Sequence, residues 1–208
     1  MKLIIFGATG TVGIQLLKQA LQQGYEVTAF TRSPEKLESL SQTNLRIFKG
    51  DLLNPKDVES AMQNHGAVLC AIGDGNKGNV RATGTKNIIT AMQRKGIKRL
   101  ICQTTLGLGE SQGNLNFFWK HIMFGLLLKK AFQDHQLQEH YLVDSNLEFT
   151  IVRPSAFTDG EVTRTYKIGF DGNYKKLSLK ISRADVADFM LQQLGNQAYL
   201  KAAVSISN

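Results

Sequence analysis

Short hydrophobic runs alternate along this chain with segments in which hydrophobic positions recur every three or four residues. The short runs predict β-strands, which lie at 2–6, 25–31, 45–49, 67–72, 98–103 and 147–152. The periodic segments predict helices, which lie near 11–23, 34–41, 55–64, 79–95 and 117–145. Repetition of strand and helix is typical of an α/β fold, a Rossmann-type doubly wound parallel sheet with helices on both faces.

The pattern changes after the sixth predicted strand. Residues 161–181 predict short strands around the turn at 171–173. Ser182 then predicts a helix start as an N-cap, with Asp185 reaching back from the third helical position. No linker, repeat or low-complexity tract divides the sequence. We expect one domain over 1–208, with a cofactor-binding core at 1–152 and a small C-terminal substrate-side portion at 153–208.

The first predicted strand runs directly into a glycine-rich loop, "GATGTVG" at 7–13. Gly7 permits a tight turn, Gly10 lets a pyrophosphate approach the backbone, and Gly13 lets the following helix pack closely. The amino end of that helix offers unpaired N–H groups and the positive end of its dipole to an anion. A P-loop would need a lysine after its second glycine, which is missing here. The loop predicts a dinucleotide site, and a tight turn that binds nothing is the alternative.

The end of the second predicted strand indicates which dinucleotide is bound. NAD sites usually place an acidic residue there for the ribose hydroxyl, whereas this chain has Arg32 and Ser33. A guanidinium and a hydroxyl suit a 2′-phosphate, so these residues favour NADP(H). A solvated arginine is the alternative. Asp51, after the third strand, has two interpretations: it accepts a hydrogen bond from the adenine amino group, or it caps the helix that begins near Pro55.

Four motifs together resemble a known family: G-A-T-G-x-x-G, T-R-S after strand two, G-D-L after strand three and V-R-P after strand six. They resemble the atypical short-chain dehydrogenases/reductases, an NAD(P)H-binding group that includes NmrA-like proteins. Within it, 4–37 and 181–191 are similar to biliverdin-IXβ reductases, also called flavin reductases. The resemblance implies a helix beside the nicotinamide at 83–87. The predicted cofactor-binding residues are Gly7, Thr9, Gly10, Thr11, Val12, Arg32, Ser33, Asp51, Leu52, Ala71, Ile72, Gly73, Thr104 and Pro154.

The catalytic residues usual in short-chain dehydrogenases are missing, because Tyr141 has no lysine four residues later. Thr104 and Thr105, at the end of the fifth strand, are candidates for orienting a substrate oxygen or the nicotinamide carboxamide. A polar strand terminus is the alternative. His135 and Glu139 share one helix face and are a candidate acid and base. The competing interpretation is an exposed ion pair with a neighbouring lysine.

Two functions from different classes follow. The first is an NADPH-dependent reductase of a flavin-like or other conjugated acceptor, in which positioning supplies most of the catalysis. Tetrapyrrole reduction is less expected, because Ala156 stands where biliverdin-IXβ reductases have a histidine. The second is a redox-sensing regulator of the NmrA-like kind, which the missing Tyr-x-x-x-Lys favours. A sugar-nucleotide epimerase is disfavoured, because few residues follow strand six.

Composition and charge narrow the partners. The net charge of +8 comes from scattered basic pairs without interleaved aromatics, so we expect a small-molecule substrate and no nucleic acid. No secretory leader precedes the first strand, so we expect a cytoplasmic protein. We also expect a monomer or a homodimer. Cys70 and Cys102 are expected as buried thiols on neighbouring strands. His65 and His121 lack partners at ligand spacing, so no metal site is expected.

The segment 115–130 is hydrophobic on nearly every face, yet lysines interrupt it before the ~20 residues that a membrane span requires. Three interpretations are open: a core helix under the sheet, an aromatic wall of the substrate pocket, or a patch that docks on a partner or a membrane surface. The pattern favours a core helix that also forms the pocket wall.

Overall fold

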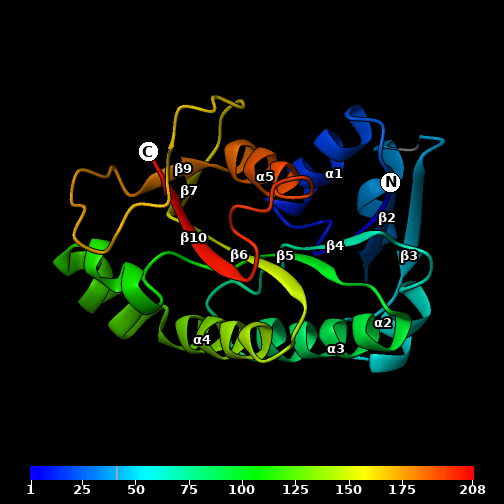
Figure 1. Cartoon of the computed structure of the whole chain (residues 1–208), viewed down its shortest axis with the longest axis horizontal. Coiled ribbons are helices and arrows are strands. Elements are labelled where there is room, and N and C mark those ends of the chain that lie inside the picture. The colour runs from blue at the N-terminus through cyan, green and yellow to red at the C-terminus, as the bar shows by residue number, and fades with distance from the viewer. Residues whose placement is uncertain (41) are drawn as a thin grey trace.

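The computed structural model of the chain describes residues 1–40 and 42–208. Within them, a mostly parallel sheet has the strand order β3-β2-β1-β4-β5-β6-β10-β8 (Figure 1). Its strands are β1 (Lys2–Phe6), β2 (Glu26–Thr31), β3 (Leu45–Lys49), β4 (Ala67–Cys70), β5 (Arg99–Gln103), β6 (Glu148–Pro154), β8 (Lys167–Ile168) and β10 (Ala202–Ser207). The six predicted strands are present, and the Rossmann-type fold is confirmed.

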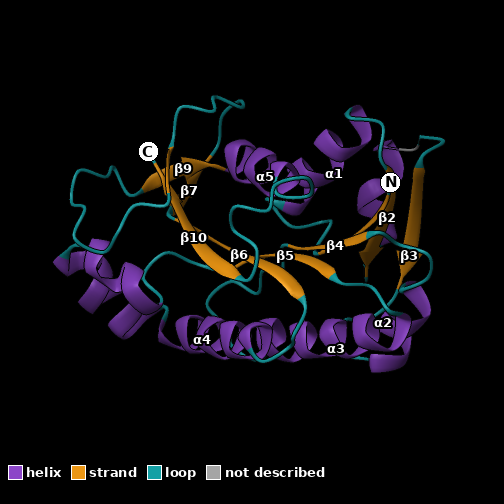
Figure 2. Ribbon diagram, viewed as in Figure 1, coloured by secondary structure: helices purple, strands orange, loops and turns teal. Residues whose placement is uncertain are grey.

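Helices cover both faces of this sheet (Figure 2). α1 (Gly13–Gln22) and α5 (Arg183–Gln192) pack together on one face, and α2 (Pro55–Ala61), α3 (Val80–Lys95) and α4 (Lys129–Val143) pack in a row on the other. Helical segments that are not α-helical are η1 (Pro34–Leu40), η2 (Gly109–Asn114) and η3 (Phe118–Leu127). No helix of the described residues has the length and hydrophobicity needed to cross a membrane.

β1 shows why a parallel sheet forms. Its residues alternate between two hydrophobic cores: Leu3 and Ile5 belong to the core under α1 and α5, whereas Ile4 and Phe6 belong to the core over α2, α3 and α4. All four side chains are fully buried. A strand buried on both faces needs an uninterrupted hydrophobic run, which explains why this run has no polar alternation.

The strand order brings β1 and β4 together at the centre of the sheet, in parallel register from Leu3–Ala67 to Phe6–Cys70. The chain moves outward on one side from β1 to β2 and β3, and on the other side from β4 to β5 and β6. Ligands of open α/β sheets bind at such a reversal, outside the carboxyl ends of the strands.

The cysteine prediction is confirmed. Cys70 and Cys102 face each other in the register between β4 and β5, and both are buried free thiols. Burial raises the pKa of the Cys102 thiol, so this sulfur stays protonated at neutral pH.

Several predicted elements differ from the structure. The predicted helix 34–41 is the 3₁₀ segment η1, and residue 41 lies outside the described residues. The strand predicted at 67–72 ends at Cys70. Residues 161–181 form little regular structure apart from β8 and the start of β9 (Lys180–Ser182), which pairs with β7 (Ala156–Thr158). β10 was not predicted, because its small and polar residues give no hydrophobic run.

The single helix predicted at 117–145 is two helices. η3 is a π-helix, in which the Leu128 N–H donates to the Met123 carbonyl at 2.6 Å, and α4 begins afterwards. Gly125 lowers the helix propensity of this run. The run is also hydrophobic all round, so no single stripe directs it onto the sheet as one straight helix.

The helix start at Ser182 is partly as predicted. Ser182 Oγ accepts from the Asp185 N–H at 2.9 Å. The Asp185 carboxylate instead accepts from the backbone N–H groups of Thr163 and Arg164, at 2.7 Å and 2.9 Å. Asp185 therefore fastens the preceding loop to α5.

We predict that Gly13→Ala lowers the free energy of unfolding by about 1–3 kcal/mol, the cost of forcing an extra carbon into a packed region. A Cβ at Gly13 would lie 1.9 Å from the Gly7 carbonyl oxygen, whereas one at Gly195 would meet nothing within 4 Å. Urea unfolding of both alanine variants measures the difference. Equal stabilities for the two variants would contradict this packing role.

Candidate functional site

Two adjoining cavities lie at the carboxyl ends of the strands. The glycine-loop cavity, of about 120 Å³, is bordered by residues that follow β1, β2, β3 and β4. The aromatic cavity, of about 340 Å³, is bordered by residues that follow β4, β5 and β6. Ile72 and Gly73 border both cavities, so the two lie next to each other across the strand reversal.

The glycine loop packs directly against the end of β4. Gly7 has a φ of 82°, and a Cβ there would lie 2.4 Å from the Ala71 carbonyl oxygen. The Gly10 N–H donates back to the Gly7 carbonyl at 2.8 Å, which closes the turn. Across the described residues, the N–H groups of Thr11, Val12 and Gly13 have no acceptor. These free donors at the amino end of α1 suit an anionic group.

The predicted cofactor residues fall into three groups. Most border the glycine-loop cavity, namely Gly7, Thr9, Gly10, Arg32, Asp51, Leu52, Ile72 and Gly73. Thr104 and Pro154 border the aromatic cavity instead. Thr11, Val12, Ser33 and Ala71 border neither. The cofactor roles of all these residues remain predictions, and Thr11 and Val12 offer backbone N–H groups that have no acceptor among the described residues.

Arg32 is exposed at the end of β2 and has no ion-pair partner among residues 1–40 and 42–208. The turn beneath it is ordered by Thr31, whose Oγ1 accepts from the Ser33 N–H at 3.0 Å and lies 3.3 Å from Thr9 Oγ1. The guanidinium is therefore available to a ligand at the rim of the glycine-loop cavity.

One interpretation of Asp51 is wrong. The residue that caps α2 is Asn54, whose side-chain oxygen accepts from the Lys56 N–H at 3.1 Å. Asp51 Oδ1 accepts from the Leu53 N–H at 3.0 Å and remains beside the cavity. Leu52 packs against α3 at Gly84, where a Cβ would lie 2.3 Å from the leucine side chain.

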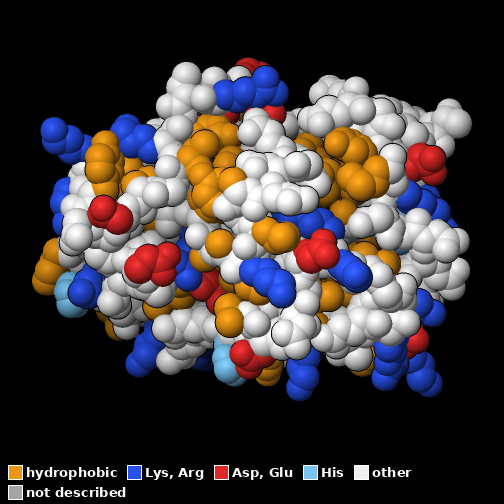
Figure 3. Space-filling model, viewed as in Figure 1, with side chains coloured by type: hydrophobic (Ala, Val, Ile, Leu, Met, Phe, Trp, Pro, Cys, Tyr) orange, Lys and Arg blue, Asp and Glu red, His pale blue; other side chains and the backbone are white. Residues whose placement is uncertain are grey.

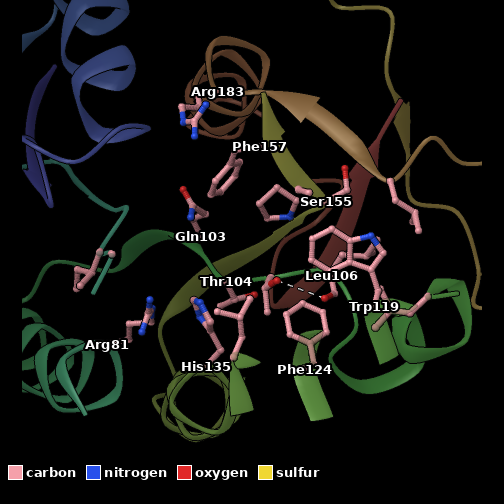
Figure 4. Close-up of a pocket in the computed structure, with 18 residues that line it drawn as sticks. Arg81, Gln103, Thr104, Leu106, Trp119, Phe124, His135, Ser155, Phe157 and Arg183 are labelled. Carbon is pink, nitrogen blue, oxygen red and sulfur yellow. Dashed lines mark hydrogen bonds between the residues drawn. The ribbon is translucent and has the colours of Figure 1, made fainter. Parts of the chain in front are cut away.

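The segment 115–128 forms one wall of the aromatic cavity, as predicted. The lining side chains from this segment are Leu115, Trp119, Phe124 and Leu128, and Figure 4 shows Trp119 and Phe124 directed into the cavity. The core part of the prediction is wrong, since no residue of η3 is buried. Phe157 lies on the other side, with the Arg183 guanidinium 5.6 Å above its ring.

The competing interpretation of His135 and Glu139, an exposed ion pair with a neighbouring lysine, is wrong, because both residues are buried. Glu139 accepts from Arg153 Nε at 2.9 Å and Nη2 at 2.7 Å, and from Thr104 Oγ1 at 2.6 Å. This network joins α4, β6 and the end of β5. The Thr104 hydroxyl proton is committed to Glu139, so toward a ligand Thr104 can only accept a hydrogen bond. Thr105 Oγ1 donates weakly to the Leu106 carbonyl at 3.3 Å.

His135 faces the aromatic cavity in its neutral form. Its Nδ1 lies 2.9 Å from Gln138 Oε1, while Gln138 Nε2 donates to Thr85 Oγ1 at 2.9 Å. The ring therefore donates from Nδ1 and leaves Nε2 as an acceptor toward the cavity. Burial, assisted by the positive charge of Arg81, lowers the pKa of His135 to about 4. At neutral pH His135 is thus a hydrogen-bond acceptor and not an acid.

Polar residues without partners also border the aromatic cavity. Within the described chain, Gln103 Oε1, Ser155 Oγ and Arg183 Nε are buried and have no hydrogen-bond partner. Buried polar atoms are normally satisfied, so these are candidates to bind a ligand. We did not predict them from the sequence. For Gln103 and Ser155 the available signal was their position at the ends of β5 and β6, because that edge of the sheet is where ligands bind. Arg183, at the start of α5, had no such signal.

The amino end of α3 is closed to ligands. Asp134 of α4 accepts from the backbone N–H groups of Arg81 and Ala82, each at 3.0 Å. The Arg81 side chain donates to the Gly75 and Lys77 carbonyls. An anion is therefore not expected at α3, in contrast to the free end of α1. Among the described residues, no cluster of His, Cys, Asp and Glu is arranged to hold a metal ion.

We predict that His135 makes the protein less stable in acid. Its pKa is about 4 in the folded chain and 6.5 as the ordinary value, so between these pH values the unfolded chain binds more protons. The contribution of neutral His135 to the free energy of unfolding is therefore fully present above pH 6.5, and it is lost as the pH falls toward 4. Relative to wild type, His135→Gln should recover up to about 3 kcal/mol at the acid end of this window. Urea unfolding at several pH values tests this, and an unchanged pH dependence in the variant would contradict it.

Known proteins resemble this chain along most of its length. A family described as NAD(P)H-binding matches residues 7–197. The photosystem II assembly factor Ycf39 of Synechocystis sp. (strain ATCC 27184 / PCC 6803 / Kazusa) is 27% identical over 172 residues, or 77% of this chain and 46% of that protein. Protein TIC 62, chloroplastic, of Oryza sativa subsp. japonica is 30% identical over 178 residues, or 72% of this chain and 34% of that protein. The chain spans 46%, 64% and 39% of the first three curated relatives.

Solved structures share the whole fold. ChuY, an anaerobillin reductase from Escherichia coli O157:H7, has a TM-score of 0.83 at 25% identity, covering 100% of this chain and 97% of that chain. A short-chain dehydrogenase/reductase from Veillonella parvula DSM 2008 in complex with NADP has a TM-score of 0.81 at 19% identity, covering 100% and 94%. The latter likeness shows the fold alone. The family match, supported by a free helix end beside a Gly7–Gly13 turn, shows that this chain belongs to the NAD(P)H-binding family and resembles its atypical short-chain reductases.

Proposed function

We propose that this protein is an NADPH-dependent oxidoreductase that reduces a flavin-like or other conjugated small molecule by hydride transfer. The observation that carries the proposal is the wall shared by the two cavities. Ile72 and Gly73 border both the glycine-loop cavity and the aromatic cavity. A dinucleotide that lies along the glycine-loop cavity would present its nicotinamide to a ligand in the aromatic cavity.

The residues present fit the phosphorylated dinucleotide. The free N–H groups of Thr11, Val12 and Gly13 would bind the pyrophosphate, and Arg32 would pair with the 2′-phosphate. A bound NADPH supplies a hydride to an acceptor placed against it. The carbonyl oxygen of Ala71 leaves no space beside Gly7 for a side chain, so the loop stays close to β4 and fixes the depth at which the cofactor binds.

The aromatic cavity suits a flat conjugated acceptor. Trp119, Phe124 and Phe157 supply ring surfaces, and Gln103 and Ser155 supply unpaired polar atoms for hydrogen bonds. His135 is neutral and accepts at Nε2, so it orients a donor group of the substrate and does not protonate it. Solvent then supplies the proton, and the protein contributes mainly by positioning the reactants.

A second candidate is a redox-sensing regulatory protein that binds NADP(H) with little or no turnover. The hydrogen bond from Thr104 to Glu139 favours this second function. Because the Thr104 hydroxyl already donates to Glu139, it cannot donate to a substrate at the end of β5, as the serine of short-chain dehydrogenases does. Some relatives carry names that indicate assembly rather than catalysis, Ycf39 among them. For either function, we propose a cytoplasmic location.

We predict that Arg32→Ala weakens NADPH binding by about 1.5–3 kcal/mol, the size of a hydrogen bond to a charged group, and leaves NADH binding nearly unchanged. Calorimetric titration with both nucleotides measures this. Arg94→Ala is the control, since Arg94 is an exposed arginine that pairs with Glu59 away from both cavities. Equal losses for NADPH and NADH would reject the role of Arg32.

We predict that the purified protein oxidises NADPH with FMN or a quinone as acceptor, and that Trp119→Ala raises the acceptor KM about tenfold, within the energy of a lost aromatic contact. NADPH affinity should not change. Trp119 is the single tryptophan, so quenching of its fluorescence reports acceptor binding directly. Tight NADPH binding without oxidation by FMN, biliverdin or quinones would favour the regulatory protein.

A further inference from the structure

The segment that forms the cavity wall has a second, outward face. Five large hydrophobic side chains lie exposed on it, and we call them the apolar end patch: Phe117, Phe118, Ile122, Leu126 and Leu127. Phe117 and Leu126 are each 73% exposed. Large hydrophobic residues gathered on one exposed surface are typical of an interaction site.

The π-helical geometry of η3 separates the two faces. Its hydrogen bonds join residues five apart, as between Leu128 and Met123. Residues 119, 124 and 128 follow intervals of five and four and line the cavity, whereas 117, 122 and 127 follow intervals of five and are exposed. Both faces therefore follow from the helical repeat, and the outward face is a consistent surface of η3.

The segment that carries the apolar end patch is positively charged. Lys120, Lys129 and Lys130 lie on the same segment and are exposed, and residues 111–133 contain no Asp or Glu. The segment, green in Figure 1, lies at the end of the molecule beyond α4 and far from β3. In the space-filling view, hydrophobic and basic side chains lie side by side at this end, with acidic side chains also present (Figure 3).

Further lysines lie on a loop packed against the same region. Asn114 Nδ2 donates to the carbonyls of Asp171 and Tyr174, at 2.6 Å and 3.0 Å, which holds that loop next to η2. Lys175 and Lys176 follow on the loop and are exposed. The same loop carries the exposed Asp171, which offsets part of this positive charge.

We propose that the apolar end patch binds the surface of a membrane that contains anionic phospholipids. Aromatic and leucine side chains can enter the boundary between headgroups and acyl chains while neighbouring lysines contact anionic headgroups. A second copy of this chain fits less well, because a symmetric contact through this patch would place the lysines of both copies, Lys120, Lys129 and Lys130, at one interface. This proposal does not rest on the proposed reductase activity.

The experiment is co-sedimentation of the full chain with vesicles of phosphatidylcholine, either pure or with about 30% phosphatidylglycerol to supply anionic headgroups. Wild type should bind the anionic vesicles at least about tenfold more tightly than the neutral ones, and added salt should weaken this binding. Phe117→Ser/Leu126→Ser/Leu127→Ser should weaken binding by at least about tenfold. Lys129→Gln/Lys130→Gln should weaken it about tenfold on anionic vesicles only.

Matched controls separate the apolar end patch from general surface effects. Leu137→Ser/Val143→Ser removes exposed hydrophobic residues from α4, and Lys36→Gln/Lys56→Gln removes the same charge elsewhere, so both should bind like wild type. Thermal unfolding confirms that each variant folds. Absent vesicle binding, equal loss in the controls, or self-association that the serine variant abolishes would overturn the proposal. NADPH turnover has no bearing on these outcomes.

Discussion

The close approach of one backbone turn to a strand end determines where the rest of the site lies. A Cβ at Gly7 would fall 2.4 Å from the Ala71 carbonyl oxygen, and a Cβ at Gly13 would fall 1.9 Å from the Gly7 carbonyl oxygen. The turn therefore packs against β4 with no side chain between them. As a result the free N–H groups of α1 point toward the strand reversal, and the residues after β4 border both cavities.

A buried ion pair holds the second half of the site. Arg153 of β6 and Glu139 of α4 form two hydrogen bonds, and Thr104 at the end of β5 donates to the same carboxylate. Removal of one partner from such a pair leaves an uncompensated buried charge, which is costly. The network thus fixes α4 relative to the sheet. Because His135 also lies on α4, the network fixes the position of His135 in the wall of the aromatic cavity.

The sequence was sufficient where one local rule decides the outcome. Ile4 and Phe6 lie in a hydrophobic run that only a doubly covered strand explains, and the loop after them could be recognised from glycine spacing. The sequence was insufficient where contacts between residues far apart in the chain determine the structure. Glu139 and Arg153 are neighbours only in space, so Glu139 alone was compatible with an exposed lysine pair. The break between η3 and α4 at Leu128 and the exposure of η3 depend on the cavity that the segment covers, which no periodicity reveals.

A crystal structure of the protein grown with NADPH tests this arrangement of the site. We expect the pyrophosphate on the N–H groups of Thr11 and Val12, the 2′-phosphate beside Arg32, and the nicotinamide at Ile72 and Gly73, open to the aromatic cavity. A dinucleotide bound in another orientation, with its nicotinamide away from that shared wall, would contradict it. So would an empty cleft at saturating NADPH.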